Sequence, residues 1–201
     1  MTITYEYGGN LYINVTNQCP NACEFCLRQN SSGSLYADNL WYEGEEPSKE
    51  VMLADLKTRD LSRYAEIVFC GYGEPACRWD DMLWLAKELK AMGSYTLRMN
   101  TNGLADCITG RNAAPEMRGL IDIVSISLNA PTAEKYNALC HPQYGLAAFD
   151  AMLHFTKEAV RTVPRVVMTV VSTMPAEDIE ACRTICENAG AAFRIREYIE
   201  S

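Results

Sequence analysis

The chain has little of what marks a secreted, membrane-spanning or nucleic-acid-binding protein. No apolar stretch approaches the length of a membrane span, and the first residues lack the basic region and apolar run of a signal peptide. Basic residues are outnumbered, 18 against 26 acidic ones, and the net charge of −8 argues against nucleic acid as the main partner. No internal repeat, linker or low-complexity tract divides the chain, so we expect one domain over residues 1–201.

Histidine is nearly absent, whereas cysteine is common. His141 and His154 are the only histidines, and both lie far along the chain from the first three of the nine cysteines: Cys19, Cys23 and Cys26. A structural zinc site at these cysteines would need a fourth ligand, and no histidine is close in sequence. Nine thiols without a secretion signal indicate a reducing compartment, so we expect a cytoplasmic protein.

The first three cysteines have a C-x3-C-x2-C spacing within residues 10–29, where an apolar strand leads into a loop. Their i, i+4, i+7 positions would also suit a buried stripe on one helix face, but Pro20 and Asn21 favour a loop. Three thiolates are soft ligands for iron, and they are one short of closing a 4Fe–4S cluster. An open metal position is where a water or a substrate can bind. The spacing therefore predicts a cluster with one iron free for chemistry.

Strand and helix patterns alternate along the chain after an N-terminal β-hairpin, whose arms are residues 2–7 and 11–16. Strands are expected at 11–16, 66–70, 95–100, 121–128, 165–172 and 192–199, and helices at 48–60, 80–92, 115–120, 146–163 and 176–189. This alternation predicts an α/β fold with a parallel sheet. Six units are too few for a closed eight-stranded barrel, so we expect an open, partial (β/α)6 TIM-like barrel.

Polar residues follow the ends of successive predicted strands, where ligands gather in such folds. Beyond the cysteine loop, these residues are Gly71-Tyr72-Gly73-Glu74-Pro75 after the second strand, Asn100-Thr101-Asn102-Gly103 after the third, and Ser125, Ser127 and Asn129 at the fourth. Each segment alone would pass for an ordinary turn or a polar-facing strand. Their occurrence in order at the strand ends predicts a binding site there.

Together these motifs resemble the radical S-adenosylmethionine superfamily over nearly the whole chain. The resemblance implies that Cys19, Cys23 and Cys26 hold one 4Fe–4S cluster and that S-adenosylmethionine chelates the free iron. A closer likeness is to the short TatD-associated members, which carry similar Asn-Gln-Cys-Pro-Asn, Gly-Tyr-Gly-Glu-Pro, Arg-x-Asn-Thr-Asn-Gly, Ser-Leu-Asn and Arg-Glu-Tyr stretches. It implies a functional link to a TatD-type hydrolase, but no substrate.

The resemblance also implies roles for single residues. The family's glycine-rich motif binds the ammonium of S-adenosylmethionine, with Tyr72 here in place of the first-choice glycine. A carboxylate and a backbone carbonyl suit a cationic amine. The cofactor-binding residues carried over are Gly73 (carbonyl) and Glu74 for the ammonium, Asn100 and Thr101 for the methionine carboxylate, Ser127 and Asn129 for the ribose, and Phe25 for the adenine.

The function that the resemblance implies is reductive cleavage of S-adenosylmethionine to a 5′-deoxyadenosyl radical that abstracts hydrogen from a substrate. It further implies low oxygen and an electron donor such as a flavodoxin or ferredoxin. One alternative is an activase that makes a glycyl radical on a partner protein. Another is an iron–sulfur electron carrier or a zinc-binding module, although neither needs an adenosine site such as Gly73, Glu74, Ser127 and Asn129.

Three arginines are candidate substrate ligands: Arg98, Arg194 and Arg196. They alternate with apolar residues, so strand periodicity turns them away from the helix-packing face of the sheet. A planar guanidinium suits a carboxylate or phosphate, and we expect a small anionic substrate. An ion pair with Glu197 or Glu74 is the alternative role for these arginines.

Other features receive weaker assignments. The long polar loop 30–46, with Trp41 and Tyr42, is a candidate lid over the site. His141, expected in a loop, is a candidate for acid–base work, and His154 is expected on a helix. The remaining cysteines are expected to be small buried residues rather than ligands: Cys70, Cys77, Cys107, Cys140, Cys182 and Cys186.

Overall fold

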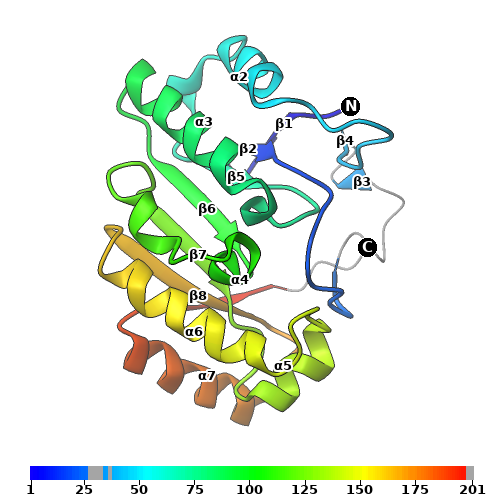
Figure 1. Cartoon of the computed structure of the whole chain (residues 1–201), viewed down its shortest axis with the longest axis vertical. Coiled ribbons are helices and arrows are strands. Elements are labelled where there is room, and N and C mark those ends of the chain that lie inside the picture. Colours follow the sequence, from blue (N-terminus) through cyan, green and yellow to red (C-terminus); the bar gives the residue numbers. More distant parts are fainter. Residues whose placement is uncertain (27–33, 36–37, 198–201) are drawn as a thin grey trace.

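A seven-stranded sheet with the order β1-β2-β5-β6-β7-β8-β9 organises the computed structural model, which describes residues 1–26, 34–35 and 38–197 (Figure 1). Within these residues β1 and β9 are the two edges, so the sheet is open. The strands after β1 run parallel to one another, and the predicted (β/α)6 partial barrel is confirmed. The strands are β1 (Thr4–Tyr7), β2 (Asn10–Asn14), β5 (Ile67–Cys70), β6 (Leu97–Thr101), β7 (Ile123–Ser127), β8 (Arg165–Val171) and β9 (Ala192–Arg196).

The N-terminal hairpin forms as predicted. Strands β1 and β2 pair antiparallel, with Tyr7 opposite Asn10. Gly8 and Gly9 between them both have positive φ angles, +57° and +78°. Two consecutive left-handed residues match the right-handed twist of the flanking strands, which is why this turn uses two glycines.

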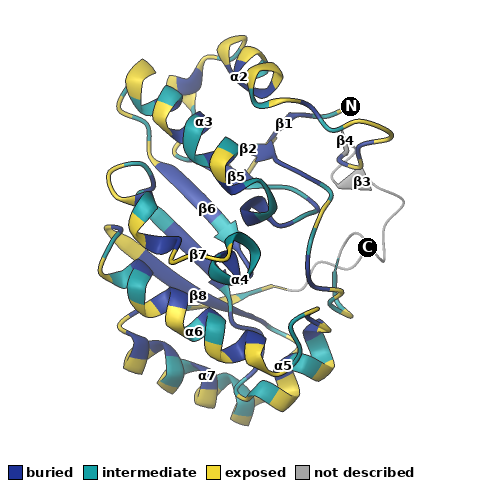
Figure 2. Cartoon of the chain, viewed as in Figure 1, coloured by how far each residue is buried: buried dark blue, intermediate teal, exposed yellow. Residues whose placement is uncertain are grey.

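Helices follow the parallel strands and cover one face of the sheet (Figures 1 and 2). Each turns its buried side towards the strands and its exposed side to solvent, as amphipathic helices of this length do. The helices are α2 (Lys49–Lys57), α3 (Trp79–Met92), α4 (Ala105–Thr109), α5 (Ala133–Cys140), α6 (Ala147–Val160) and α7 (Ala176–Ala189), with single 3₁₀ turns at Leu61–Arg63, Pro75–Arg78 and Ala114–Met117. In the described residues no helix has the length and apolarity needed to cross a membrane.

The sequence patterns missed two of these helices, α4 and α5. Both are shorter than the window over which helical periodicity becomes visible. His141, expected in a loop, directly follows Cys140, which is the last residue of α5. The Thr132 side chain caps the start of this helix, and His141 ends it with a left-handed backbone at φ 42°.

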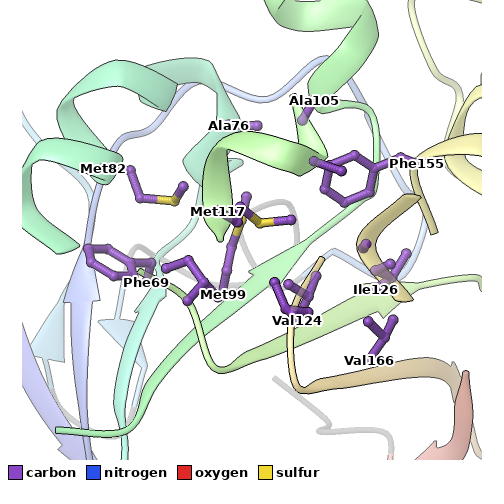
Figure 3. Packing of buried hydrophobic residues seen from close by; sticks show 14 of the residues in the cluster. Phe69, Ala76, Met82, Met99, Ala105, Met117, Val124, Ile126, Phe155 and Val166 are labelled. Carbon is purple, nitrogen blue, oxygen red and sulfur yellow. The ribbon is translucent and has the colours of Figure 1, made fainter. Parts of the chain in front are cut away.

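The hydrophobic core lies between the sheet and the helices. Phe69, Met99 and Val124 point from three neighbouring strands towards Met82 and Phe155 on the helices (Figure 3). Because strand side chains alternate, the residues between them face the opposite side, which we call the inner face. Besides the apolar Val68, Ile123 and Val167, the inner face carries polar and aromatic residues: Tyr12, Cys70, Arg98, Asn100, Ser125 and Ser127.

The described part of the candidate lid loop is fastened to the end of β2. Leu40 and Tyr42 are buried, and the Tyr42 hydroxyl donates to the backbone carbonyl of Asn14. The Asn14 amide in turn donates to the Leu40 carbonyl at 2.6 Å. Trp41 is exposed. Residues 30–33 and 36–37 of the loop lie outside the described residues, and the lid function stays a prediction.

Candidate active site at the carboxyl ends of the strands

The cysteine loop leaves β2 and crosses the carboxyl ends of the strands as far as α5 (Figure 1). The first residues of the loop are bound by the segment that follows β5. The backbone N–H of Gly73 donates to the Thr16 carbonyl at 2.9 Å, and that of Glu74 donates to the Gln18 carbonyl at 2.7 Å. The loop and the glycine-rich motif are therefore one docked unit.

The far side of the same loop is bound to the C-terminal end of α5. The N–H groups of Ala22 and Glu24 donate to the carbonyls of Cys140 (3.0 Å) and Leu139 (3.1 Å), which a helix end leaves without intrahelical partners. The N–H of Gln143 donates back to the loop at the Pro20 carbonyl, at 2.9 Å. Backbone contacts thus fix both ends of the segment that carries Cys19 and Cys23.

Glycine is required in the docked motif because of close backbone contact. A Cβ on Gly73 would lie 2.3 Å from the Thr16 carbonyl oxygen and 2.5 Å from that of Gln18. Gly71 has φ +114°, and a Cβ there would lie 2.2 Å from Oδ1 of Asn14. The Gly-x-Gly pattern therefore lets the chain after β5 approach β2 and the cysteine loop.

Cys19, Cys23 and Cys26 are all half-buried on this loop. Among the described residues, no three His, Cys, Asp or Glu side chains are grouped so that they could hold a single metal ion. A tetrahedral zinc site would need such convergence. In a 4Fe–4S cluster each protein thiolate binds its own iron, so the three need not meet at one point. The donor set and its docked loop fit the cluster better than they fit zinc.

Asn102, which the sequence reasoning did not assign, lies beside the first of these cysteines. Its amide nitrogen is 4.0 Å from the Cys19 sulfur, and its backbone N–H donates to Glu74 at 2.6 Å. Hydrogen bonds to ligand sulfurs help to set the properties of an iron–sulfur site. Its position in the predicted Asn100-Thr101-Asn102-Gly103 strand end was the available signal.

Glu74 is a buried carboxyl group surrounded by protein donors. Its Oε1 accepts from the Thr101 hydroxyl (2.7 Å) and from the Ala76 N–H (3.1 Å), and its Oε2 accepts from the Asn102 N–H (2.6 Å). Burial raises the pKa of Glu74 from 4.5 to about 7, although these hydrogen bonds act in the opposite direction. The carboxyl group is thus firmly positioned and close to its protonation midpoint at neutral pH.

The residues predicted for the methionine carboxylate differ in their surroundings. Thr101 is buried, donates to Glu74 and accepts from the Gly103 N–H at 3.0 Å. Asn100 is half-buried on the inner face, where its amide donates to the sulfur of Cys70 at 3.4 Å and its Oδ1 accepts from Arg98. Thr101 therefore holds Glu74 in place, whereas the Asn100 side chain lies on the inner face of the sheet.

The end of β7 presents Ser127 and Asn129 at the same edge of the sheet. Ser127 is half-buried and pairs in register with Thr169 of β8. Asn129 is buried in a left-handed conformation at φ 58°, and its amide nitrogen is 3.9 Å from the sulfur of Cys140. Its Oδ1 is buried and has no hydrogen-bond partner in the described part of the chain. A buried acceptor of this kind is suited to a ligand that brings its own donor, such as a hydroxyl group.

Arg194 is within electrostatic reach of both other predicted arginines, and among the described residues an ion pair is found for Arg98. Arg98 is buried, with Nε 2.7 Å from a Glu66 carboxylate oxygen, so the predicted pairing with Glu197 or Glu74 was wrong for this residue. Burial, and then the charge of Arg98, lower the pKa of Arg194. Burial also lowers the pKa of Arg196, and the Cys70 thiol acts in the opposite direction. Among the described residues, the buried Nε of Arg196 has no hydrogen-bond partner.

The remaining assigned residues lie around this edge or away from it. Phe25 is half-buried against the core, and exposed His141 is 3.3 Å from the Glu24 carboxylate beside the cysteine loop. His154 is an exposed residue of α6, as predicted. The other six cysteines were expected to be small buried residues. Three of them are buried, namely Cys140, Cys182 and Cys186, and three are half-buried, namely Cys70, Cys77 and Cys107.

The fold and the site define a class of α/β proteins in which an open parallel barrel presents a three-cysteine loop at the carboxyl ends of its strands. The sequence profile of the Radical SAM superfamily matches residues 13–187. The chain belongs to this superfamily, whose members are enzymes.

Solved structures of low sequence identity share the fold. Streptococcus suis SuiB bound to the precursor peptide SuiA has a TM-score of 0.71 and 16% identity, covering 98% of this chain and 41% of SuiB. Methylornithine synthase (PylB) has a TM-score of 0.65 and 13% identity, covering 94% of this chain and 53% of that enzyme. A radical SAM methyltransferase from Sphaerobacter thermophilus has a TM-score of 0.50 and 16% identity, covering 96% and 68%.

This chain thus spans about two fifths of SuiB and about half of PylB. No curated protein sequence matches it significantly.

Proposed function

We propose that this enzyme binds a 4Fe–4S cluster through Cys19, Cys23 and Cys26 and cleaves S-adenosylmethionine reductively to act on a small anionic substrate. One observation carries the proposal. Backbone contacts dock the three-cysteine loop between the glycine-rich motif and α5. The docking gathers the thiols at the same edge of the sheet as Glu74 and Asn129.

The bound cluster would supply one electron, cleaving S-adenosylmethionine to methionine and a 5′-deoxyadenosyl radical. The protein's task is then to orient the cofactor and substrate and to limit side reactions. Asn102 would donate to the Cys19 thiolate, at the site of its present 4.0 Å contact. The docked loop would hold the thiolates in place, because preorganised ligands lose little entropy on binding.

The cofactor would bind along the ends of β5, β6 and β7. Glu74 and the carbonyl of Gly73 would receive the ammonium group, whose charge favours the ionised form of the buried carboxyl. Asn100 would hold the methionine carboxylate, with Thr101 acting through its hydrogen bond to Glu74.

The nucleoside would lie nearer the end of β7. Ser127 and the unpaired Oδ1 of Asn129 would receive the ribose hydroxyls, since that oxygen is buried and open to a donor. Phe25 would contact the adenine from its half-buried position on the cysteine loop.

Arg196 is the arginine that we propose to bind the substrate anion. Its Nε is buried and has no hydrogen-bond partner within residues 1–26, 34–35 and 38–197, and the side chain is near enough to Cys23 and Cys70 to interact with both electrostatically. A carboxylate or phosphate would satisfy the guanidinium by charge-assisted hydrogen bonds. Arg194 would add positive charge, whereas Arg98 would contribute through its contacts with Glu66 and Asn100.

Several parts of this proposal concern partners. A flavodoxin or ferredoxin would donate the electron under low oxygen in the cytoplasm, and a TatD-type hydrolase would be a functional associate. An activase that forms a glycyl radical on a partner protein is the alternative enzyme activity. An electron carrier without S-adenosylmethionine chemistry is the alternative outside enzymatic catalysis.

The test begins with anaerobic reconstitution, iron and sulfide counting, and electron paramagnetic resonance of the reduced protein with and without S-adenosylmethionine. We expect about four irons per chain and a spectrum that changes on addition of the cofactor. Stoichiometric zinc, or a spectrum indifferent to S-adenosylmethionine, would refute the proposal.

Substrate class is tested by the formation of 5′-deoxyadenosine in the presence of small carboxylates, small phosphates or peptides. We expect stimulation by small anions and its loss in Arg196→Met, with the iron content unchanged. Stimulation by peptides alone would favour the partner-protein alternative.

A further inference from the structure

Cys140 is a buried thiol beside the cluster loop for which the proposed function has no use. It is the last residue of α5 and is fully buried. Its sulfur lies 3.9 Å from the amide nitrogen of Asn129. On its other side, the Cys140 side chain lies beside that of Cys23, near enough for the two thiols to interact, where the neighbours of Cys23 are bound to the end of α5. The thiol thus connects a proposed ribose-binding residue with a proposed cluster ligand.

The backbone fixes this thiol pair in place. Ala22 and Glu24, the two neighbours of Cys23, donate to the carbonyls of Cys140 and Leu139. The amide of Asn21 also donates to the buried hydroxyl of Tyr136, one turn earlier in α5, at 3.1 Å. The loop and the helix end therefore cannot separate at Cys23 without breaking these three hydrogen bonds, of which the one between Asn21 and Tyr136 is buried, and each contributes to stability.

The direction of the hydrogen bond follows from the chemistry of the groups. A thiol has one hydrogen to donate, and the amide nitrogen of Asn129 can only donate to the Cys140 sulfur. A cysteine that ligates a metal must be a thiolate, which can only accept. With Cys23 as a ligand, the hydrogen between the two sulfurs must therefore belong to Cys140.

We propose that Cys140 is a positioning residue whose S–H group donates to the Cys23 thiolate, is oriented by the Asn129 amide, and raises the reduction potential of the cluster. The inference rests on the proposed function, because it requires a cluster at Cys23. A donor to a ligand sulfur offsets part of its negative charge, and the reduced cluster carries one more negative charge than the oxidised cluster. The hydrogen bond therefore stabilises the reduced form more strongly.

The two ends of the Asn129 amide group have different surroundings. Its nitrogen is directed to Cys140, whereas its oxygen is the buried acceptor without a partner. A ligand hydroxyl that donates to this oxygen would hold the amide in the orientation that serves Cys140. Cofactor binding at Asn129 would then reinforce the contact with the cluster ligand.

The experiment compares two donor-free variants, Cys140→Ala and Cys140→Val, with Cys140→Ser, whose hydroxyl can still donate. Cys186→Ala is the matched control, since Cys186 is equally buried but lies on α7. Each protein is reconstituted, its iron and sulfide are counted, and its potential is measured by a redox titration followed by electron paramagnetic resonance without S-adenosylmethionine. We expect a lower potential in the donor-free variants and a potential close to wild type in Cys140→Ser and Cys186→Ala.

Failure of this inference is distinguishable from failure of the proposed function. Wild-type protein that takes up no cluster would refute the proposed function and, with it, the inference. Fully loaded donor-free variants with an unchanged potential would overturn the inference alone. If neither donor-free variant retains a cluster, electron–nuclear double resonance of wild type exchanged into D₂O decides. A deuteron coupled to the cluster in wild type, and shifted in coupling but retained in Cys140→Ser, whose hydroxyl also exchanges, supports the S–H donor, whereas its absence from wild type overturns it.

Discussion

Replacing Glu74 with glutamine should remove a specific pH dependence from the stability of the metal-free, reduced protein. The carboxyl is buried, and its pKa is raised from 4.5 to about 7. A raised pKa means that the folded protein binds a proton more tightly than the unfolded chain does. Between these two values the native state holds the proton while the unfolded state releases it, so stability must fall as pH rises.

The size of the effect follows from the shift. A difference of about 2.5 pKa units between the two states corresponds to about 3 kcal/mol, at about 1.4 kcal/mol per unit. This contribution is fully present below pH 4.5 and is lost as pH rises to about 7. Glutamine has no proton to release, so Glu74→Gln should lack this part of the pH profile. Its amide also places a donor near N–H groups, which adds a cost that does not vary with pH.

The measurement is urea unfolding at several pH values from 4.5 to 8 for wild type, Glu74→Gln and Glu45→Gln. Glu45 is exposed, so its variant controls for the loss of one surface carboxyl. We expect the stability of wild type relative to Glu74→Gln to decline by about 3 kcal/mol across this range. Parallel profiles for wild type and Glu74→Gln would refute the reasoning, because they would mean that the buried carboxyl titrates alike in both states.

Three further predictions follow from single contacts. Gly73→Ala should lower the free energy of unfolding by about 1–3 kcal/mol through the clash at 2.3 Å with a carbonyl of the cysteine loop. Gly110→Ala has open space and should lose stability only through its left-handed backbone at φ +70°, so a loss in Gly73→Ala that is no larger than in Gly110→Ala would contradict this account. Arg98→Met should lower the free energy of unfolding in urea by about 2 kcal/mol, because it leaves the partly exposed Glu66 unpaired. Adding Glu66→Met should restore most of this loss. If the effects of the two substitutions simply add in the double variant, the pair is not coupled. Asn129→Ala should weaken S-adenosylmethionine binding to the cluster-loaded protein several-fold, measured by equilibrium dialysis, and undiminished binding would remove Asn129 from the cofactor site.

The local chemistry of the strand ends could be predicted from the sequence because it depends on neighbouring residues. Alternation of strand and helix patterns, the turn at Gly8 and Gly9, and the C-x3-C-x2-C spacing are all visible over short windows. The rule that parallel strands direct their carboxyl ends to one edge then places the cysteine loop and Glu74 together. The open barrel follows from these features, the superfamily was expected from the resemblance of the motifs, and both are confirmed.

Contacts between distant residues required the tertiary structure. In the sequence, Glu74 is one carboxylate in a glycine-rich turn, and nothing there indicates that it is buried. Its pKa is raised by burial, in a position where it contacts Thr101 and Asn102. The pairing of Arg98 with Glu66 also depends on two adjacent strands that are 32 residues apart in sequence. Strand periodicity gives the face of a side chain but not its partner.

Cys140 shows the same division most clearly. From the sequence, Cys140 was expected only to be a small buried residue, and its helix was missed because eight residues give too little periodicity to be detected. The fold places it beside Cys23, which is 117 residues away in sequence. There the carbonyls at the end of α5 need hydrogen-bond donors, and the backbone N–H groups of the cysteine loop supply them. Residue types and spacing determined which chemistry this protein can hold. The packing of the loop against α5 and β7 decided which side chains surround it, because burial and hydrogen-bond partners depend on neighbours that are remote in sequence.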